Sequence, residues 1–67
     1  MVQWKYNNAR QHFVGYVNGT AAYRVWNDIH YGWSYESLRD KVGMDGYTDA
    51  REAMNGAERD AWFWNEL

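Results

Sequence analysis

Two histidines and the acids near them are the residues best able to hold a metal ion. His12 and His30 could be joined by Asp28 or by an acid further along the chain. Their spacing does not support a site, because the sequence has no His-x-x-x-His pair, no cluster of histidine and carboxylate at ligand spacing, and no cysteine. We therefore predict no metal site and no cofactor.

The serine and threonine hydroxyls are the candidate nucleophiles. None of them lies in a recognisable triad, nucleophile elbow or glycine-rich phosphate loop. A chain of 67 residues also has little room for a pocket that buries most of a substrate. The sequence therefore predicts no catalytic residues, and we do not expect an enzyme.

Aromatic residues within a predicted hairpin suggest binding instead of catalysis. Asn18-Gly19 separates two β-prone runs, and both residues tolerate the positive φ angles of a type I′ turn. A two-residue turn sets the register of the strands that it joins. It would place Val14 opposite Tyr23 and extend the same pairing to the ends of the hairpin.

This register would divide the hairpin side chains between two faces. The predicted core face carries His12, Val14, Tyr16, Ala21, Tyr23 and Val25. The other face carries the predicted binding residues Phe13, Val17, Arg24 and Trp26. Trp, Tyr and Arg are enriched where interfaces gain most of their affinity, so this face would bind a partner unless the following chain folds back over it. The sequence leaves both alternatives open.

Three large aromatic residues occupy consecutive positions near the C-terminus. Successive helical residues point about 100° apart, so Trp62, Phe63 and Trp64 cannot all face the core. Trp64 fits the apolar stripe of the predicted helix, which leaves Trp62 or Phe63 for its flank or for a partner chain. Trp62 and Phe63 are therefore included among the predicted binding residues.

The elements that carry these residues indicate an α+β fold. Residues 2–6 alternate apolar and polar, as a half-buried strand does, and residues 32–38 form either a fourth strand or a short helical turn. Residues 39–47 have the glycines of a loop. From the predicted N-cap Thr48, alanines recur at helical spacing. The predicted fold is a three- to four-stranded antiparallel β-meander packed against one C-terminal α-helix, in a single domain of residues 1–67.

Charge and hydropathy narrow the classes of partner. The net charge is −2, divided into +2 over residues 1–30 and −4 over residues 31–67. That distribution lacks the dense basic stripe of sequence-independent DNA binding, so nucleic acid is a less favoured partner. No apolar run approaches the ~18 residues of a membrane span, and the N-terminus lacks a signal-peptide pattern. We expect no membrane contact and a cytoplasmic location.

The order of these segments also supports a resemblance. The hairpin run 15–26, the Gly32-Trp33 pair and the segment 46–53 (Gly-Tyr-Thr-Asp-Ala-Arg-Glu-Ala) resemble the layout of small uncharacterised proteins encoded by bacteriophages and prophages. The resemblance covers most of the chain and implies an accessory protein of the host-cell cytoplasm. A sheet with a C-terminal helix also resembles the DNA-binding domains of some integrases, which are generally basic, unlike this chain.

The sequence thus favours a small non-enzymatic protein-binding module, such as a phage-encoded modulator or inhibitor that engages a host protein during host takeover. One alternative is nucleic-acid binding through the sheet, with Lys5, Arg10 and Arg24 contacting phosphates and Trp26 or a tyrosine stacking on bases. Another is a small structural or assembly subunit. A homodimer is compatible with each of these.

Overall fold

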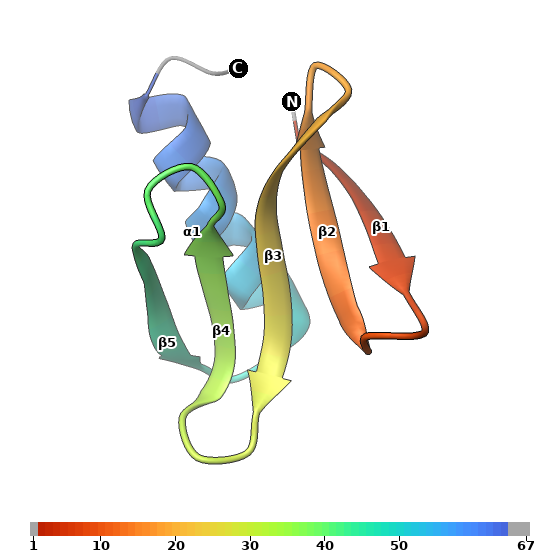
Figure 1. The fold of residues 1–67 in the computed structure, drawn as a ribbon. Helices are drawn as coiled ribbons and strands as arrows, with labels where there is room; N and C mark the ends of the chain where they lie inside the picture. Colours follow the sequence, from red (N-terminus) through yellow and green to blue (C-terminus); the bar gives the residue numbers. More distant parts are fainter. Residues whose placement is uncertain (1, 65–67) are drawn as a thin grey trace.

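Five strands follow one another in chain order and form one antiparallel sheet. In the computed structural model, which describes residues 2–64, the strands are β1 (Gln3–Asn7), β2 (His12–Val17), β3 (Thr20–Asp28), β4 (Gly32–Ser37) and β5 (Gly43–Tyr47). The helix α1 (Ala50–Phe63) lies against one face of the sheet, behind β3 and β4 in the view of Figure 1. The predicted α+β meander with a C-terminal helix is confirmed, and its sheet has five strands.

The β2–β3 hairpin forms around Asn18-Gly19 as predicted, but its register changes along the strands. Near the turn, Tyr16 pairs with Ala21; one step further, Gly15 pairs with Tyr23. Ala22 is therefore an extra residue, and the ladder contains a β-bulge. The predicted pairing of Val14 with Tyr23 is wrong, because one inserted residue moves every later side chain of β3 to the opposite face.

The bulge reverses the predicted faces of β2, whereas Tyr23 and Val25 of β3 lie in the core as predicted. Val17, Tyr23 and Val25 are buried towards α1, and Phe13 packs against the same core. His12 and Val14, which were predicted in the core, belong to the opposite face because they alternate with Phe13 along β2. The core therefore uses the β2 face on which the sequence predicts the binding residues Phe13 and Val17.

Two segments after the hairpin are strands, one of them left open by the sequence and the other predicted as a loop. Residues 32–37 form a strand, which settles the choice between a strand and a helical turn. Residues 43–47, predicted as loop, form the edge strand β5. Its glycines serve the pairing with β4: a Cβ at Gly43 would overlap the carbonyl group of Tyr35, and Gly46 has a φ angle of +84°.

The helix packs closely on the sheet because its inner face is made of small residues. Ala53, Ala57 and Ala61 are buried, as the alanine spacing predicts, and Gly56 is buried with them. They face large rings of the sheet, so that small residues on one layer accommodate large ones on the other. The N-cap is Asp49 and not the predicted Thr48; the Asp49 carboxylate accepts a hydrogen bond from the backbone N–H of Glu52.

Two side-chain hydrogen bonds join the sheet to acids of the helix. The indole Nε1 of Trp4 donates to Glu58 Oε2 at 2.9 Å, and the hydroxyl of the fully buried Tyr23 donates to Asp60 Oδ2 at 2.8 Å. Part of the acidic charge of α1 is thereby used for packing.

The helix has 14 residues, and none of the described chain forms a helix suited to crossing a bilayer.

Candidate functional site

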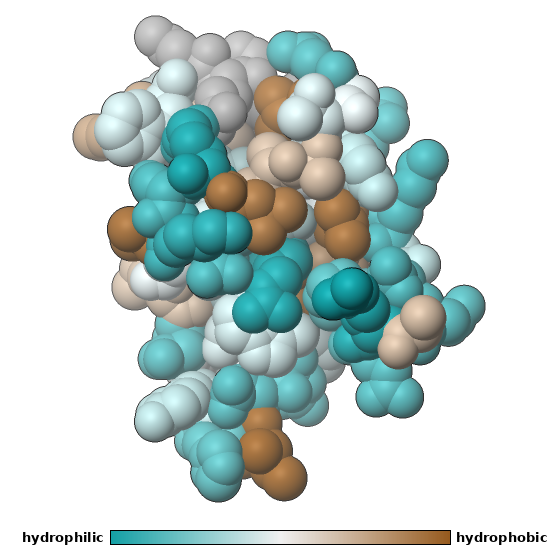
Figure 2. Space-filling model, in the orientation of Figure 1, coloured by the Kyte–Doolittle hydropathy of each residue, from teal (hydrophilic) through white to brown (hydrophobic). Residues whose placement is uncertain are grey.

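The face of the sheet that points away from α1 is not covered by another described element. We call it the open face and define it by the residues that alternate with the core residues along the strands: Lys5, His12, Val14, Tyr16, Arg24, Trp26, Ser34 and Glu36. Figure 2 shows this face as largely hydrophilic, with apolar side chains in separate patches. It therefore offers charges and single rings and not one continuous apolar surface.

The structure separates the predicted binding residues into three places. Arg24 and Trp26 lie together on the open face, whereas Phe13 and Val17 belong to the core side. Trp62 and Phe63 lie near the C-terminal end of α1 and are 71% and 76% exposed. The four predicted hairpin residues therefore do not share one face, because the bulge leaves Phe13 and Val17 on the core side of the sheet.

A broad groove runs across the open face from the β1–β2 turn to the β4–β5 loop. It has a volume of about 470 Å³. Its lining includes Val14, Tyr16 and Ala21 from the middle of the hairpin. Its charged residues come from separate segments of the chain: Arg10, Arg24, Glu36 and Lys41, together with His12. We call it the basic groove, because only one of its lining residues is a carboxylate.

Cations lie over both aromatic rings of this region. Lys5 Nζ lies 5.6 Å from the centre of the Tyr16 ring, and the Arg24 guanidinium lies 4.1 Å from the Trp26 ring. Both distances are within the range of cation–π attraction. Arg24 Nε also donates to Glu36 Oε1 at 3.1 Å, so one arginine is held by a ring and a carboxylate together.

Unlike Arg24, three cations of this region are not held by a carboxylate of the described chain. Lys5, Arg10 and Lys41 are exposed, and none of them forms an ion pair with another residue in the described range 2–64. An exposed ammonium or guanidinium without a carboxylate partner needs to lose only water when an anion arrives. The basic groove is thus bordered by cations that can accept an external anion.

The pKa of His12 responds to burial and to the cations of the groove. Partial burial and the nearby charges of Arg24 and Arg10 lower the pKa of His12 from its ordinary value of 6.5. The imidazole is therefore neutral over a wider pH range than a free histidine. A bound anion would oppose those two cations and raise the pKa of His12.

A turn next to the groove fixes the position of Trp26. The carboxylate of Asp28 accepts hydrogen bonds from the backbone N–H groups of His30 and Tyr31 at 2.8 and 3.2 Å. It also accepts one from the indole Nε1 of Trp26 at 3.4 Å. These bonds, first of all the one from His30, lower the pKa of Asp28 and keep it charged. Trp26 is thereby held at the end of β3.

The end of α1 carries a second group of exposed rings. Trp64 was predicted to face the core, but it caps the helix and is 53% exposed. Its ring lies 6.0 Å from that of Phe63 and 5.0 Å from the guanidinium of Arg39. The buried stripe of α1 ends about one turn earlier, at Ala61.

Metal chemistry finds no support in the part of the chain that the structure describes. Within residues 2–64, no three side chains of His, Asp or Glu are grouped as ligands. His12, His30 and Asp28 do not form such a group.

Sequence reasoning missed Lys41, Tyr16 and His12 as residues of this surface. The signal that could have placed Tyr16 and His12 there was the pair Ala21-Ala22, where two small residues after a tight turn allow a bulge. Lys41 could not be placed, because β5 was not recognised.

Comparison with protein families, with curated proteins and with solved structures finds no match for this chain.

Proposed function

We propose that this chain binds single-stranded nucleic acid across the open face of its sheet. The observation that carries the proposal is the convergence of cations on one groove: Arg10, Arg24 and Lys41 line it, and Lys5 lies beside it, over the ring of Tyr16. Glu36 is the one carboxylate that lines the groove, and Arg24 already pairs with it. Phosphates would therefore meet a surplus of positive charge.

Aromatic rings supply the second component of such a surface. Proteins that bind single strands without strict sequence preference combine a positive groove with rings on which bases stack. Tyr16 lines the basic groove, and Trp26 lies next to it on the same face. Each ring has a cation within 6 Å of its centre. Charge for a phosphate thus lies beside each ring that could stack on a base.

The distribution of polarity favours this partner over a protein on the open face. Protein interfaces gain most of their affinity from buried apolar and aromatic centres with few charges. The open face instead has separate apolar patches among hydrophilic side chains (Figure 2). A single strand is also favoured over a duplex, because the bases of a duplex are already stacked on one another and cannot stack on Tyr16 or Trp26.

The test is a titration of a short, fluorescein-labelled oligo(dT), followed by fluorescence anisotropy at increasing NaCl concentration. Single strands lose affinity with a slope of about −0.7 in log K against log salt for each phosphate contact, so four cations predict a slope of about −3. Lys5→Gln, Arg10→Gln and Lys41→Gln should each reduce the slope by about 0.7.

Arg51→Gln is the matched control for these variants. Arg51 is exposed on α1, on the other side of the molecule, and its substitution removes the same charge. It should leave the slope unchanged. The proposal is wrong if oligo(dT) does not bind at low salt, or if Arg51→Gln weakens binding as much as the three groove variants do.

Protein binding is a second candidate, favoured by the exposed rings at the end of α1. Trp62, Phe63 and Trp64 are each more than half exposed. At 150–250 Å² for a whole aromatic side chain, they offer roughly 300–500 Å² of apolar surface. A symmetric pair of such patches would bury roughly 600–1,000 Å², less than the ~1,200 Å² of a stable interface. A second copy would therefore associate only weakly through these rings.

Sedimentation over a wide concentration range tests this candidate. Self-association that Trp62→Ser and Phe63→Ser abolish would support it. Ile29→Ser is the control, because Ile29 is 92% exposed in the β3–β4 turn, at the opposite end of the molecule in Figure 1. Association that depends equally on Ile29 would contradict it.

A further inference from the structure

We infer that a small cavity beside the basic groove is a subsite for one nucleobase, and that it favours cytosine over thymine. The inference rests on the proposed function, because the cavity has a role only if a single strand occupies the open face. The cavity has a volume of about 180 Å³. Whole-ligand pockets are usually 300–1,000 Å³, so this one fits a single planar group and not an independent ligand.

The cavity shares a border with the basic groove. Arg24 lines the groove, Trp26 lines the cavity, and Glu36 lines both. Because the Arg24 guanidinium lies over the Trp26 ring at 4.1 Å, this stacked pair stands at the boundary of the two spaces. A strand whose phosphate contacts Arg24 would therefore have its base next to Trp26.

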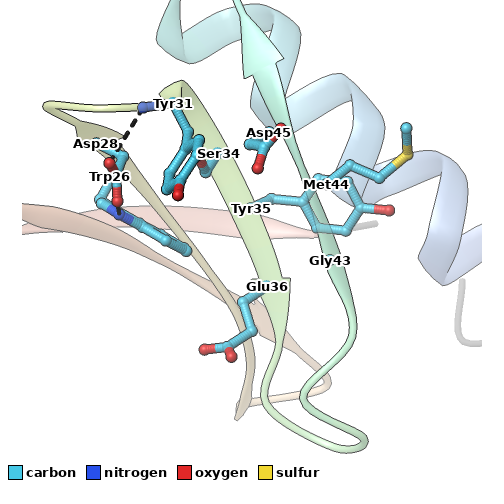
Figure 3. A pocket seen from close by; sticks show the side chains of 9 residues that line it. All are labelled: Trp26, Asp28, Tyr31, Ser34, Tyr35, Glu36, Gly43, Met44 and Asp45. Atoms are coloured by element: carbon cyan, nitrogen blue, oxygen red, sulfur yellow. Dashed lines mark hydrogen bonds between the residues drawn. The ribbon is translucent and has the colours of Figure 1, made fainter.

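Aromatic side chains form the walls of the cavity. Figure 3 shows Trp26 and Tyr31 on the same side of the sheet as Ser34 and Asp45. Trp26 is held by Asp28, which also binds the backbone of the following turn. The indole is thus fixed in place before a ligand arrives, as a stacking surface should be.

Three carboxylates line the cavity, Asp28, Glu36 and Asp45, and none of its lining residues is a cation. Asp28 already accepts hydrogen bonds from Trp26 and His30, and Glu36 accepts one from Arg24. Asp45 lines it from β5 and forms no hydrogen bond or ion pair with any residue from 2 to 64. The Ser34 hydroxyl is occupied, since it donates to the carbonyl oxygen of Gly32 at 3.1 Å. The free acceptor is therefore a carboxylate on the wall opposite Trp26 in Figure 3.

A free carboxylate distinguishes the two pyrimidines. Cytosine carries an exocyclic N4 amino group that donates to Asp or Glu, whereas thymine carries the O4 carbonyl oxygen at the same position. A thymine in this cavity would place that oxygen near a carboxylate with no donor between them. Cytosine would replace water around Asp45 with a charge-assisted hydrogen bond. We expect oligo(dC) to bind about 5-fold more tightly than oligo(dT), which corresponds to about 1 kcal/mol.

The test is a comparison of labelled oligo(dC) and oligo(dT) of equal length at one low salt concentration. Asp45→Asn should remove the preference, because an amide can donate to thymine O4 as well as accept from cytosine. Asp40→Asn is the matched control. It removes the same charge from the adjacent β4–β5 loop, and an Asn side chain can still accept the hydrogen bond that Asp40 takes from the Val42 N–H. It should raise both affinities alike and leave their ratio unchanged.

The possible outcomes separate this inference from the proposed function. If neither oligonucleotide binds, the proposed function fails and the subsite fails with it. If both bind equally to the wild type, the subsite is wrong while binding on the open face stands. If the preference for oligo(dC) persists in Asp45→Asn, or disappears in Asp40→Asn, the assignment to this cavity is wrong.

Discussion

Replacing Gly56 by alanine tests how closely the helix and the sheet approach. In an exposed helix this change stabilises by about 1 kcal/mol, because glycine is the poorer helix former. Here Gly56 is buried against the sheet. A Cβ at this position would overlap the hydroxyl of Tyr47 and lie 3.1 Å from Cε2 of Tyr35. Overpacking of this kind costs about 1–3 kcal/mol.

The two effects oppose each other, and the contact should outweigh the propensity. The net change expected for Gly56→Ala is a destabilisation of up to about 2 kcal/mol. In a domain of this size, each kcal/mol lowers the melting temperature by about 4–8 °C. Thermal and urea denaturation followed by circular dichroism would measure the change, and an unaltered urea m-value would show that the unfolded state is not affected.

A second substitution distinguishes the contact from other causes. Tyr47→Val removes the ring nearest to Gly56 and keeps a residue suited to the edge strand β5. In that background Gly56→Ala should become neutral or stabilising by up to about 1 kcal/mol, so the two changes should couple by about 1–3 kcal/mol. If Gly56→Ala stabilises the wild type by about 1 kcal/mol and the same amount in Tyr47→Val, the reasoning about close approach is refuted.

Three further changes test other parts of the fold. Tyr23→Phe removes the 2.8 Å hydrogen bond to Asp60 from a fully buried ring, and should cost about 1.5–3 kcal/mol in urea denaturation; no loss would mean that the bond adds nothing to stability. Gly43→Ala should disrupt the pairing of β5 with β4, seen as faster amide hydrogen exchange in β5, and unchanged exchange would contradict the close contact there. The lowered pKa of His12 means that the unfolded chain binds more protons as the pH falls below 6.5, so stability should decrease over that window. His12→Gln should remove this part of the pH dependence, and an identical pH profile in the variant would contradict it.

Local patterns in the sequence were sufficient for the order and type of most elements. Asn18-Gly19 specifies a tight turn because both residues tolerate positive φ, and φ at these positions is 50° and 80°. The alanine spacing from Ala53 to Ala61 predicts the buried stripe of α1, because residues three and four apart share a helix face. These features depend on neighbours in the chain, which the sequence displays directly.

The pairing of the sheet and the composition of the open face were decided by tertiary structure. One extra residue, Ala22, reverses the faces of β3 relative to β2, and no local preference determines whether the ladder absorbs it there. β5 has little strand character by itself and forms because β4 offers an edge whose backbone groups need partners. The net charge of −2 likewise does not reveal that several cations lie near one groove. Lys5, Arg10, Arg24 and Lys41 are scattered along the chain and meet only when five strands lie side by side, while acids such as Glu58 and Asp60 bind the opposite face of the sheet through the helix.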